Sequence, residues 1–317
     1  MRTRFEWIAL LLAACAETHG AAALAPVFSD NMALQRDVPA QVWGTAEPGE
    51  RVTIGFGGQS RTATADAAGK WRVALDPLAA SAEPRSLVFN RFQLTNVVVG
   101  DVWICAGQSN MEWPLAKEAH AAEEAPAANH PLLRLLNMNY AGQYVSTGQF
   151  GQAELARMTP EGFYRGKWQV CTPASVKDFS AVGYYFGRAL LMETGVPVGL
   201  INLAVGGSPA ESWIRPAILP PDMTGGNWLD NPRLDQWCRQ RALENLGGAP
   251  AHHPFEPGFL WDAGIGPLIP FSIRGAAWYQ GESNASTDWR VRQHDVLFPL
   301  LVSDWRKQWG LGDFQFL

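Results

Sequence analysis

Residues that bind metal ions or nucleic acids are scarce in this chain. Its 317 residues include only four cysteines and six histidines, and no two cysteines have the CxxC spacing of a zinc site. His252 and His253 are adjacent, but they precede a proline in a polar segment, so we expect them to be solvated. Charged residues make up 17% of the sequence, and 30 acidic against 25 basic side chains give a net charge of −5. The composition therefore predicts no metal cofactor and no nucleic-acid partner.

The apolar run at the start of the chain is too short to span a bilayer. Residues 8–14 form a short apolar core after a basic start, which is typical of a secretory signal. Leu12–Cys15 resembles a bacterial lipobox, which would make Cys15 the lipidated first residue of the mature protein. Alternatively, a signal peptidase cleaves among Ala21–Ala25. We assign residues 1–25 to this signal and expect an exported protein that is periplasmic, anchored to the outer membrane through Cys15, or secreted.

The remaining chain is long enough for two domains, and a hydrophobic content of 47% provides for a sizeable core. Residues 26–96 contain short strand patterns separated by turns. Arg51–Phe56, for example, alternates polar and apolar residues as a half-buried strand does. Such spacing predicts a small antiparallel β-sandwich. No cluster of titratable residues occurs there, so we expect an accessory domain without chemistry of its own.

The pattern changes at Val97, where strands begin to alternate with longer helical segments. This alternation predicts an α/β domain over residues 97–317, with a parallel sheet and crossover helices. Phe179–Glu193 has helical spacing, with Ser180 in a capping position and Gly195 at its end. Arg290–Trp309 is expected to be a long amphipathic helix that breaks at Pro299.

Three predicted strands end in short turns of glycine, serine and amide residues. These turns are Gly107–Asn110, Gly206–Ser208 and Gln280–Asn284. Taken alone, the first is an ordinary turn in which Ser109 or Asn110 caps a helix. The carboxyl ends of parallel strands meet at one edge of a sheet, however, so we expect the three turns to converge. Convergence of three such turns favours the interpretation that they form a hydrolase active site over the interpretation that they are three ordinary structural turns.

The converging turns contain the groups that acyl transfer requires. That reaction needs an activated hydroxyl and hydrogen-bond donors aimed at the developing oxyanion. Ser109 is the candidate nucleophile. Its own N–H, the N–H of Gly206 or Gly207, and the side-chain amide of Gln280 or Asn284 are the candidate donors. This chemistry uses only side chains and water, so no cofactor is expected.

The same turns carry a resemblance to a known family. The segments are VWICAGQSNMEWPL (102–115), LINLAVGGSPAESW (200–213) and RGAAWYQGESNAS (274–286). They resemble the blocks of the sialate O-acetylesterase family of SGNH-type serine esterases, and the resemblance extends over nearly all of residues 26–317. It implies a flavodoxin-like catalytic domain that removes O-acetyl groups from a carbohydrate such as sialic acid through an acyl-serine intermediate.

By motif position, the resemblance also implies roles for individual residues. Ser109 matches the family's nucleophile, and Gly206–Gly207 matches the glycine block of its oxyanion hole. Gln280 is favoured over Asn284 as the side-chain donor because it lies nearer the strand end. Glu282 is expected to orient its loop by hydrogen bonding rather than to act as the acid of a catalytic triad.

The chain departs from the family pattern in its catalytic base. The family's Asp and His come from a short block after the segment that corresponds to Ser303–Trp309, and no such block precedes Leu317. Neither His120, His130 nor His294 is well placed to replace it. We therefore expect an esterase domain that is incomplete at its C-terminal end and impaired in activity. The alternatives are a non-catalytic glycan-binding protein and an acetyl esterase for plant polysaccharides.

Overall fold

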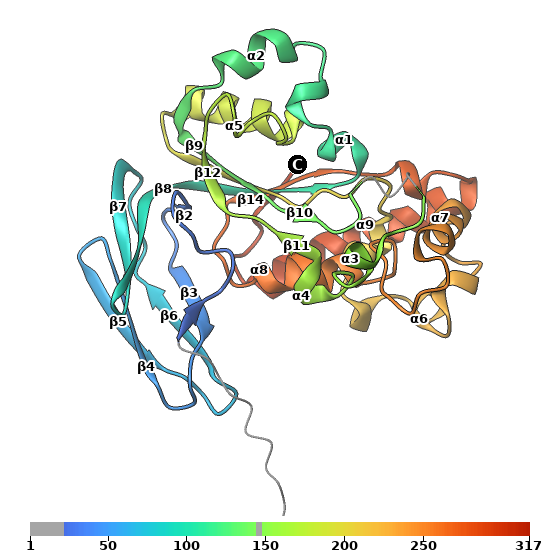
Figure 1. Cartoon of the computed structure of the whole chain (residues 1–317), viewed down its shortest axis with the longest axis horizontal. Helices are drawn as coiled ribbons and strands as arrows, with labels where there is room; N and C mark the ends of the chain where they lie inside the picture. The colour runs from blue at the N-terminus through green and yellow to red at the C-terminus, as the bar shows by residue number, and fades with distance from the viewer. Residues whose placement is uncertain (1–21, 144–147) are drawn as a thin grey trace, which may run out of the picture.

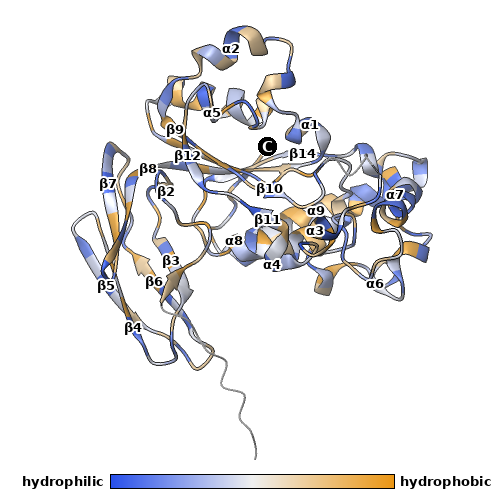
Figure 2. Ribbon diagram, in the orientation of Figure 1, coloured by the Kyte–Doolittle hydropathy of each residue, from blue (hydrophilic) through white to orange (hydrophobic). Residues whose placement is uncertain are grey.

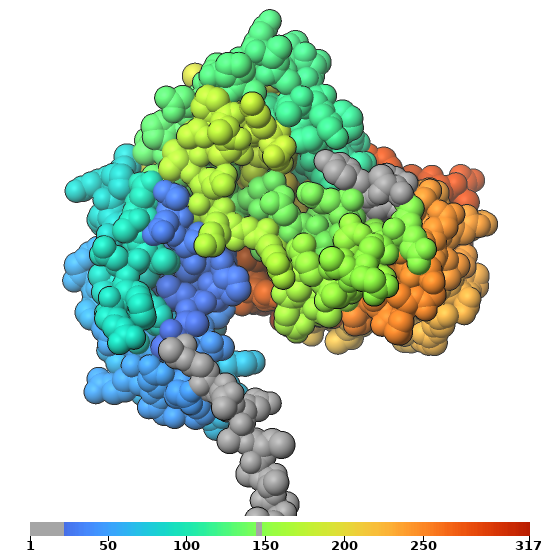
Figure 3. All heavy atoms as spheres, viewed as in Figure 1, coloured from blue at the N-terminus to red at the C-terminus, as the bar shows by residue number. Residues whose placement is uncertain are grey.

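The computed structural model describes residues 22–143 and 148–317. Cys15 and most of the predicted signal lie outside these residues, although Ala23–Leu24 forms a short strand, β1. In Figure 1 the N-terminal strands stand beside a larger body of helices and strands, and Figure 3 shows them as a blue lobe on one flank of that body. Among the helices of the described residues, none is long and apolar enough to cross a membrane.

The N-terminal strands are divided between a three-stranded sheet and one end of a ten-stranded sheet, and the two share one core. Their bounds are β1 (Ala23–Leu24), β2 (Ala33–Gln35), β3 (Ala40–Thr45), β4 (Arg51–Phe56), β5 (Gln59–Thr64), β6 (Lys70–Leu75) and β7 (Ser81–Phe89). One sheet has the order β1-β3-β6, and β4, β5 and β7 belong to the other. Val52, Ile54 and Phe56 of β4 point into the shared core with Val42 and Val73 of the first sheet. The alternation predicted for β4 is thus confirmed.

One long strand connects these sheets to the rest of the fold. β8 (Phe92–Gly107) has 16 residues. Its first half pairs with β7 and β2, and its second half pairs in parallel with β13 (Val198–Asn202) and β14 (Gly275–Tyr279). The strand crosses the predicted domain boundary at residues 96 and 97 without a break. Ser109 therefore follows a strand that is fixed at both ends.

The central sheet is mixed, with a parallel core. Beside β8, β13 and β14 it contains β9 (His130–Asn137), β12 (Trp168–Cys171) and β15 (Gln315–Phe316). The order is β12-β9-β13-β8-β14-β15, in which only β12 runs antiparallel to its neighbour. Numbered along the chain, the five parallel strands β9-β13-β8-β14-β15 have the order 2-3-1-4-5, and β12 extends the sheet at the edge of β9. The predicted α/β class is confirmed.

Helices cover both faces of this sheet. They are α1 (Ser109–Glu112), α2 (Ala121–Ala127), α3 (Gln152–Leu155), α4 (Pro160–Phe163), α5 (Ala181–Thr194), α6 (Pro221–Thr224), α7 (Gln236–Leu246), α8 (Gly266–Leu268) and α9 (Asp288–Trp309). Figure 1 places α1, α2 and α5 on one face and α8 and α9 on the other. Trp103 and Cys105 of β8 face the first group, whereas Ile104 and Ala106 face the second. Figure 2 shows the resulting hydrophobic interior and the mostly hydrophilic surface of α7.

Two long helices test the predictions for helix ends. At the start of α5, Ser180 Oγ accepts a hydrogen bond of 3.0 Å from the Gly183 N–H, and Gly195 ends the helix with a φ of 66°. Both predictions are confirmed. The expected break at Pro299 is wrong, because α9 continues through it. The buried side chains of Leu297 and Leu301 anchor the helix on both sides of the proline, which offsets the lost backbone hydrogen bond.

Candidate active site

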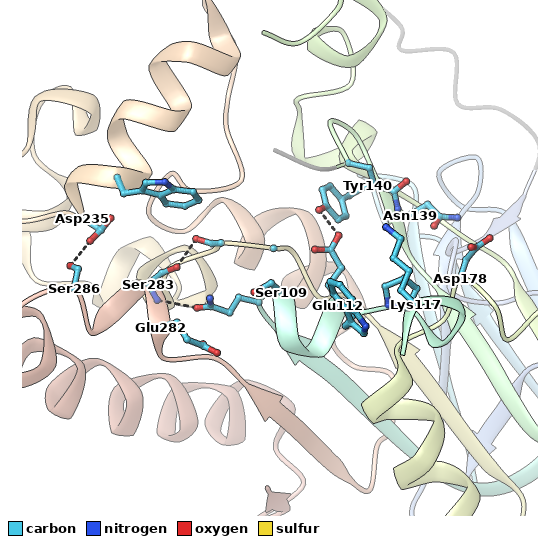
Figure 4. Close-up of a pocket in the computed structure, with 17 residues that line it drawn as sticks. Ser109, Glu112, Lys117, Asn139, Tyr140, Asp178, Asp235, Glu282, Ser283 and Ser286 are labelled. Carbon is cyan, nitrogen blue, oxygen red and sulfur yellow. Dashed lines mark hydrogen bonds between the residues drawn. The ribbon is translucent and has the colours of Figure 1, made fainter. Parts of the chain in front are cut away.

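A cavity of about 1050 Å³ opens at the carboxyl ends of β8, β13 and β14. Figure 4 shows the side chains that converge on it. Of the residues predicted for the site, Ser109, Gly206, Gly207 and Glu282 line this cavity, whereas Gln280 and Asn284 do not. The predicted convergence of the three turns is therefore observed.

Ser109 is the first residue of α1, and its side chain is exposed in the cavity. The preceding Gly107 has a φ of 135°, and a Cβ there would lie only 2.1 Å from the carbonyl oxygen of Tyr279. Only glycine allows β8 to turn this close to β14. The Gln108 N–H then donates to the same carbonyl at 2.9 Å. No other described residue forms a hydrogen bond with the Ser109 hydroxyl, so this group faces the cavity unengaged.

The glycine turn after β13 lies directly beside Ser109. The Val205 N–H donates to the Gly107 carbonyl at 3.0 Å, which joins the two turns. A Cβ at Gly206 would lie 3.9 Å from the Cβ of Ser109. Gly207 follows with a φ of 75°, in the region that favours glycine. The backbone of this turn thus lies next to the candidate nucleophile with no side chain of its own in between.

The side-chain amides of Gln280 and Asn284 point away from the cavity. Gln280 Nε2 donates to the Ser208 carbonyl at 3.3 Å and to Asn284 Oδ1 at 2.6 Å. Asn284 is only 1% exposed, and its Nδ2 donates to Glu211 Oε2 at 2.9 Å. In this geometry neither amide is presented to an oxyanion at Ser109. Both instead belong to a buried network that supports the site from behind.

A buried ion pair completes that network. Arg290 Nη2 lies 2.8 Å from Glu211 Oε1, and the two side chains are 4% and 1% exposed. Arg290 comes from α9 and Glu211 from the 3-10 turn η2 (Ala210–Trp213), so the pair joins elements far apart in the sequence. Sequence patterns alone did not indicate it. The only signal was a charged residue, Glu211, shortly after the glycine turn Gly206–Ser208.

Residues of the 3-10 turn η6 (Glu282–Asn284) bind both other turns. Glu282 Oε1 accepts a hydrogen bond from Asn110 Nδ2, so this carboxylate joins its own turn to the turn after β8. The Ser283 N–H donates to Gln108 Oε1 at 3.2 Å, and Ser283 Oγ donates to the Gly207 carbonyl at 2.9 Å. The three turns therefore form one hydrogen-bonded unit around Ser109.

Glu112 and Tyr140 are site residues that the sequence did not indicate. Tyr140 donates a hydrogen bond of 2.6 Å to Glu112 Oε1, and a Cβ at Gly206 would lie only 2.5 Å from Glu112 Oε2, so the carboxylate packs against this glycine. Burial raises the pKa of Glu112, and the hydrogen bond from Tyr140, the nearby Gly206 backbone and the charge of Lys117 partly oppose this effect. Tyr140 lies in β10 (Asn139–Tyr140), within a long segment that has no regular sequence pattern.

No histidine is among the described residues that line the cavity. His120 caps α2, and His130 lies at the start of β9 beside Tyr184. His294 lies on α9, where burial lowers its pKa. None of these three histidines lies in the cavity with Ser109, in agreement with the prediction that none is well placed to act as its base.

The adjacent residues His252 and His253 differ in their exposure to solvent. His252 is exposed and lies 2.8 Å from Glu256. The expectation of solvation is wrong for His253, which is fully buried, with its Nε2 3.1 Å from Asn245 Oδ1. Burial lowers the pKa of His253 to about 3, so this ring is neutral. The described residues contain no group of three or more side chains suited to hold a metal ion.

Comparisons with known proteins agree with these motifs. Residues 99–224 match a carbohydrate esterase family described as sialic acid-specific acetylesterase. The chain is thus similar to the sialate O-acetylesterases. It is 27% identical over 305 residues to the human sialate O-acetylesterase and 26% identical over 338 residues to the mouse protein. These alignments cover 91% and 97% of the chain but only 53% and 60% of the relatives.

A solved structure extends the similarity to three dimensions. A carbohydrate acetylesterase from Xanthomonas citri is 31% identical to the chain and superimposes with a TM-score of 0.71. The match covers 93% of this chain and 59% of that protein. The chain therefore spans between one half and three fifths of the length of these three acetylesterases. The resemblance predicted from the motifs is confirmed.

Proposed function

We propose that this protein hydrolyses acetyl esters on carbohydrates, with Ser109 as the nucleophile. The observation that carries the proposal is the exposed Ser109 hydroxyl, which faces the cavity beside the glycine turn Gly206–Gly207. The similarity to acetylesterases supports the same reaction class. The position of Ser109 at the carboxyl end of a central parallel strand, with helices on both faces of the sheet, also supports assignment to the flavodoxin-like, SGNH-type hydrolases.

The proposed reaction proceeds through an acyl-serine intermediate. Ser109 Oγ attacks the acetyl carbonyl carbon, its proton passes to a solvent water in the cavity, and the carbonyl oxygen becomes an oxyanion. Backbone N–H groups next to Ser109 stabilise this negative charge. The oxyanion then collapses, the C–O bond to the sugar breaks, and the sugar oxygen takes up a proton from solvent water. Water cleaves the acetyl-serine ester to release acetate, so the cycle needs no cofactor.

We further propose that proton removal from Ser109 is slow, because no histidine lines the cavity in the described part of the chain. A serine protease without members of its triad still accelerates hydrolysis by about 10³–10⁴ over water. We expect a residual activity of this order. The same observation favours a second candidate function, in which the protein binds glycans in this cavity without turnover.

The surroundings of Ser109 favour a neutral sugar. Trp113 and Trp237 line the cavity and are 49% and 45% exposed, so each offers a flat apolar face on which a sugar ring can stack. Four carboxylates line the same cavity, against one lysine, Lys117: those of Glu112, Asp178, Asp235 and Glu282. An excess of negative charge opposes binding of the sialic acid carboxylate. We therefore favour acetylated neutral saccharides, such as those of plant polysaccharides.

Acetate release distinguishes the two substrate classes. We expect kcat/KM for acetylated xylo-oligosaccharides to exceed that for an O-acetylated sialoside by about tenfold or more at low salt, because like charges repel. An increase from about 10 mM to about 1 M salt is expected to narrow the difference, since salt screens exposed charges. Equal rates at low salt would contradict the preference for neutral sugars. Binding of either glycan without acetate release would favour the second candidate.

We also propose that the protein is exported from the cytoplasm. The basic start and the apolar run of residues 8–14 support export, with lipidation at Cys15 and ordinary cleavage near Ala21–Ala25 as the two routes. The mass of the mature N-terminal peptide distinguishes them, because only the lipobox route leaves a modified Cys15.

A further inference from the structure

The cavity extends to both sides of Ser109. Figure 4 shows Asp235 and Ser286 on one side of Ser109, and Asn139 and Asp178 on the other. The cavity volume of about 1050 Å³ exceeds the range of about 300–1000 Å³ that is typical of sites for drug-sized ligands. An acetylated monosaccharide is smaller than such a ligand, so it fills only part of this cavity. The groups at the two ends are therefore free to bind further parts of a substrate.

A chain of asparagine side chains supports the end at Asn139 and Asp178. Asn202, the last residue of β13, is buried, and its Nδ2 donates to Asn137 Oδ1 at 2.8 Å. Asn137 Nδ2 in turn donates to the Asp178 carbonyl at 2.9 Å and to Asn139 Oδ1 at 3.4 Å. Because one nitrogen contacts both residues, Asn139 and Asp178 lie side by side. The chain of amides thus connects a central strand to the cavity surface.

Asn139 and Asp178 present unengaged polar groups to the cavity. Both residues are exposed and line it. Asn139 Oδ1 accepts from Asn137, whereas Asn139 Nδ2 has no acceptor and the Asp178 carboxylate no donor among the residues that the structure describes. A sugar hydroxyl both donates and accepts, so an amide donor beside a carboxylate acceptor suits two hydroxyls of one sugar ring.

The opposite end of the cavity offers a flat aromatic surface. A Cβ at Gly207 would lie 2.9 Å from the ring of Trp237, so this indole packs directly on the glycine turn beside Ser109. The Ser286 hydroxyl donates to Asp235 at 2.6 Å and joins the start of α7 to the segment after η6. The half-exposed indole is therefore held in place next to the candidate nucleophile.

We propose that Asn139 and Asp178 form a subsite for a second sugar residue, so that the substrate is an oligosaccharide acetylated within its chain and not a free monosaccharide. The acetylated residue lies at Ser109, between the two ends of the cavity. One neighbouring residue hydrogen-bonds to Asn139 and Asp178, and the other stacks on Trp237. The inference rests on the proposed function and specifies its substrate class.

Binding of unacetylated oligosaccharides to Ser109→Ala tests the subsite without turnover. We expect calorimetry to give xylotetraose or mannotetraose a Kd at least about tenfold below that of the matching monosaccharide, since the tetrasaccharide reaches more groups. Asp178→Ala in this background removes a hydrogen bond to a charged group and should raise the tetrasaccharide Kd about tenfold. Asp178→Asn retains an acceptor oxygen and should have a smaller effect. Asn139→Ala removes a neutral donor and should raise the Kd about fivefold.

Kinetics with the Ser109 hydroxyl present separate the subsite from the reaction itself. Asp178→Ala should lower kcat/KM for acetate release from an internally acetylated xylotetraose about tenfold. It should leave kcat/KM for acetylated xylose unchanged, because a single sugar residue at Ser109 does not reach Asp178. An equal loss with both esters would mean that Asp178 supports the reaction site and not a second sugar residue.

Asp295→Ala and Asn129→Ala are the matched controls. Both side chains are exposed outside the cavity and form no hydrogen bond with a described residue, so both variants should leave the tetrasaccharide Kd unchanged. The proposal is wrong if neither tetrasaccharide binds more tightly than its monosaccharide, or if Asp178→Ala and Asn139→Ala do not weaken binding. Tetrasaccharide binding as expected, without acetate release by the wild type, would instead refute the proposed function and leave the subsite in place.

Discussion

A burst of about one 4-nitrophenolate per protein is expected when the wild-type chain meets 4-nitrophenyl acetate, and no burst is expected from Ser109→Ala. Without a base both acylation and deacylation are slow, but 4-nitrophenolate departs without an acid, so acylation of Ser109 is slowed less than hydrolysis of the acetyl-serine. Hydrolysis of the acetyl-serine requires an activated water, and no histidine lines the described cavity to supply a base. The intermediate should therefore accumulate. Stopped-flow absorbance gives the burst amplitude directly.

The control for this experiment is a serine outside the cavity. Ser303 is exposed on α9, where its hydroxyl donates to the Leu300 carbonyl at 3.0 Å. Ser303→Ala should retain the full burst. A burst of equal amplitude in Ser109→Ala would mean that another group is acylated, and Ser109 would not be the nucleophile.

Replacement of Arg290 by methionine is expected to lower the free energy of unfolding by about 3–5 kcal/mol. The substitution leaves the Glu211 carboxylate buried at 1% exposure, with the Asn284 amide as its remaining side-chain partner. An uncompensated buried charge is far more costly than a lost surface contact. Denaturant unfolding followed by tryptophan fluorescence measures the effect.

Two further variants separate the buried charge from other causes. Arg61→Met removes the exposed partner of Asp76 and should cost less than about 1 kcal/mol. Adding Glu211→Gln to Arg290→Met neutralises the stranded carboxylate and should recover part of the lost stability. If Arg290→Met costs no more than Arg61→Met, the ion pair does not support the fold as described.

Local patterns predicted the regular elements well. The cap at Ser180, the end of α5 at Gly195 and the alternation of β4 depend on neighbours within a few positions. The predicted helix break at Pro299 is wrong because the outcome there does not depend on neighbours within a few positions. Tertiary packing of α9 outweighs a local preference there, and packing is not visible in a short window of sequence.

One topological rule, that parallel strands end at a common edge of the sheet, was enough to predict which turns form the candidate site. Because parallel strands end at a common edge, the sequence placed Ser109, Gly206, Gly207 and Glu282 together, and all four line the cavity. The rule does not determine where a side chain points within a turn. Gln280 lies at the predicted strand end, yet its amide binds Ser208 and Asn284 instead of facing the cavity.

The contacts that sequence could not reveal join distant segments. Tyr140 meets Glu112 through an irregular stretch of chain, and Arg290 meets Glu211 across 79 positions. Neither pair has a spacing that a helix or a strand would impose. Their identification required the fold to be known first.

Mass spectrometry of the acylated protein tests the central claim most directly. After brief incubation with 4-nitrophenyl acetate and an acid quench, the account predicts one acetyl group on the peptide that contains Ser109, and none on that peptide in Ser109→Ala. An acetyl group at another residue, with Ser109 unmodified, would contradict the assignment of Ser109 as the nucleophile.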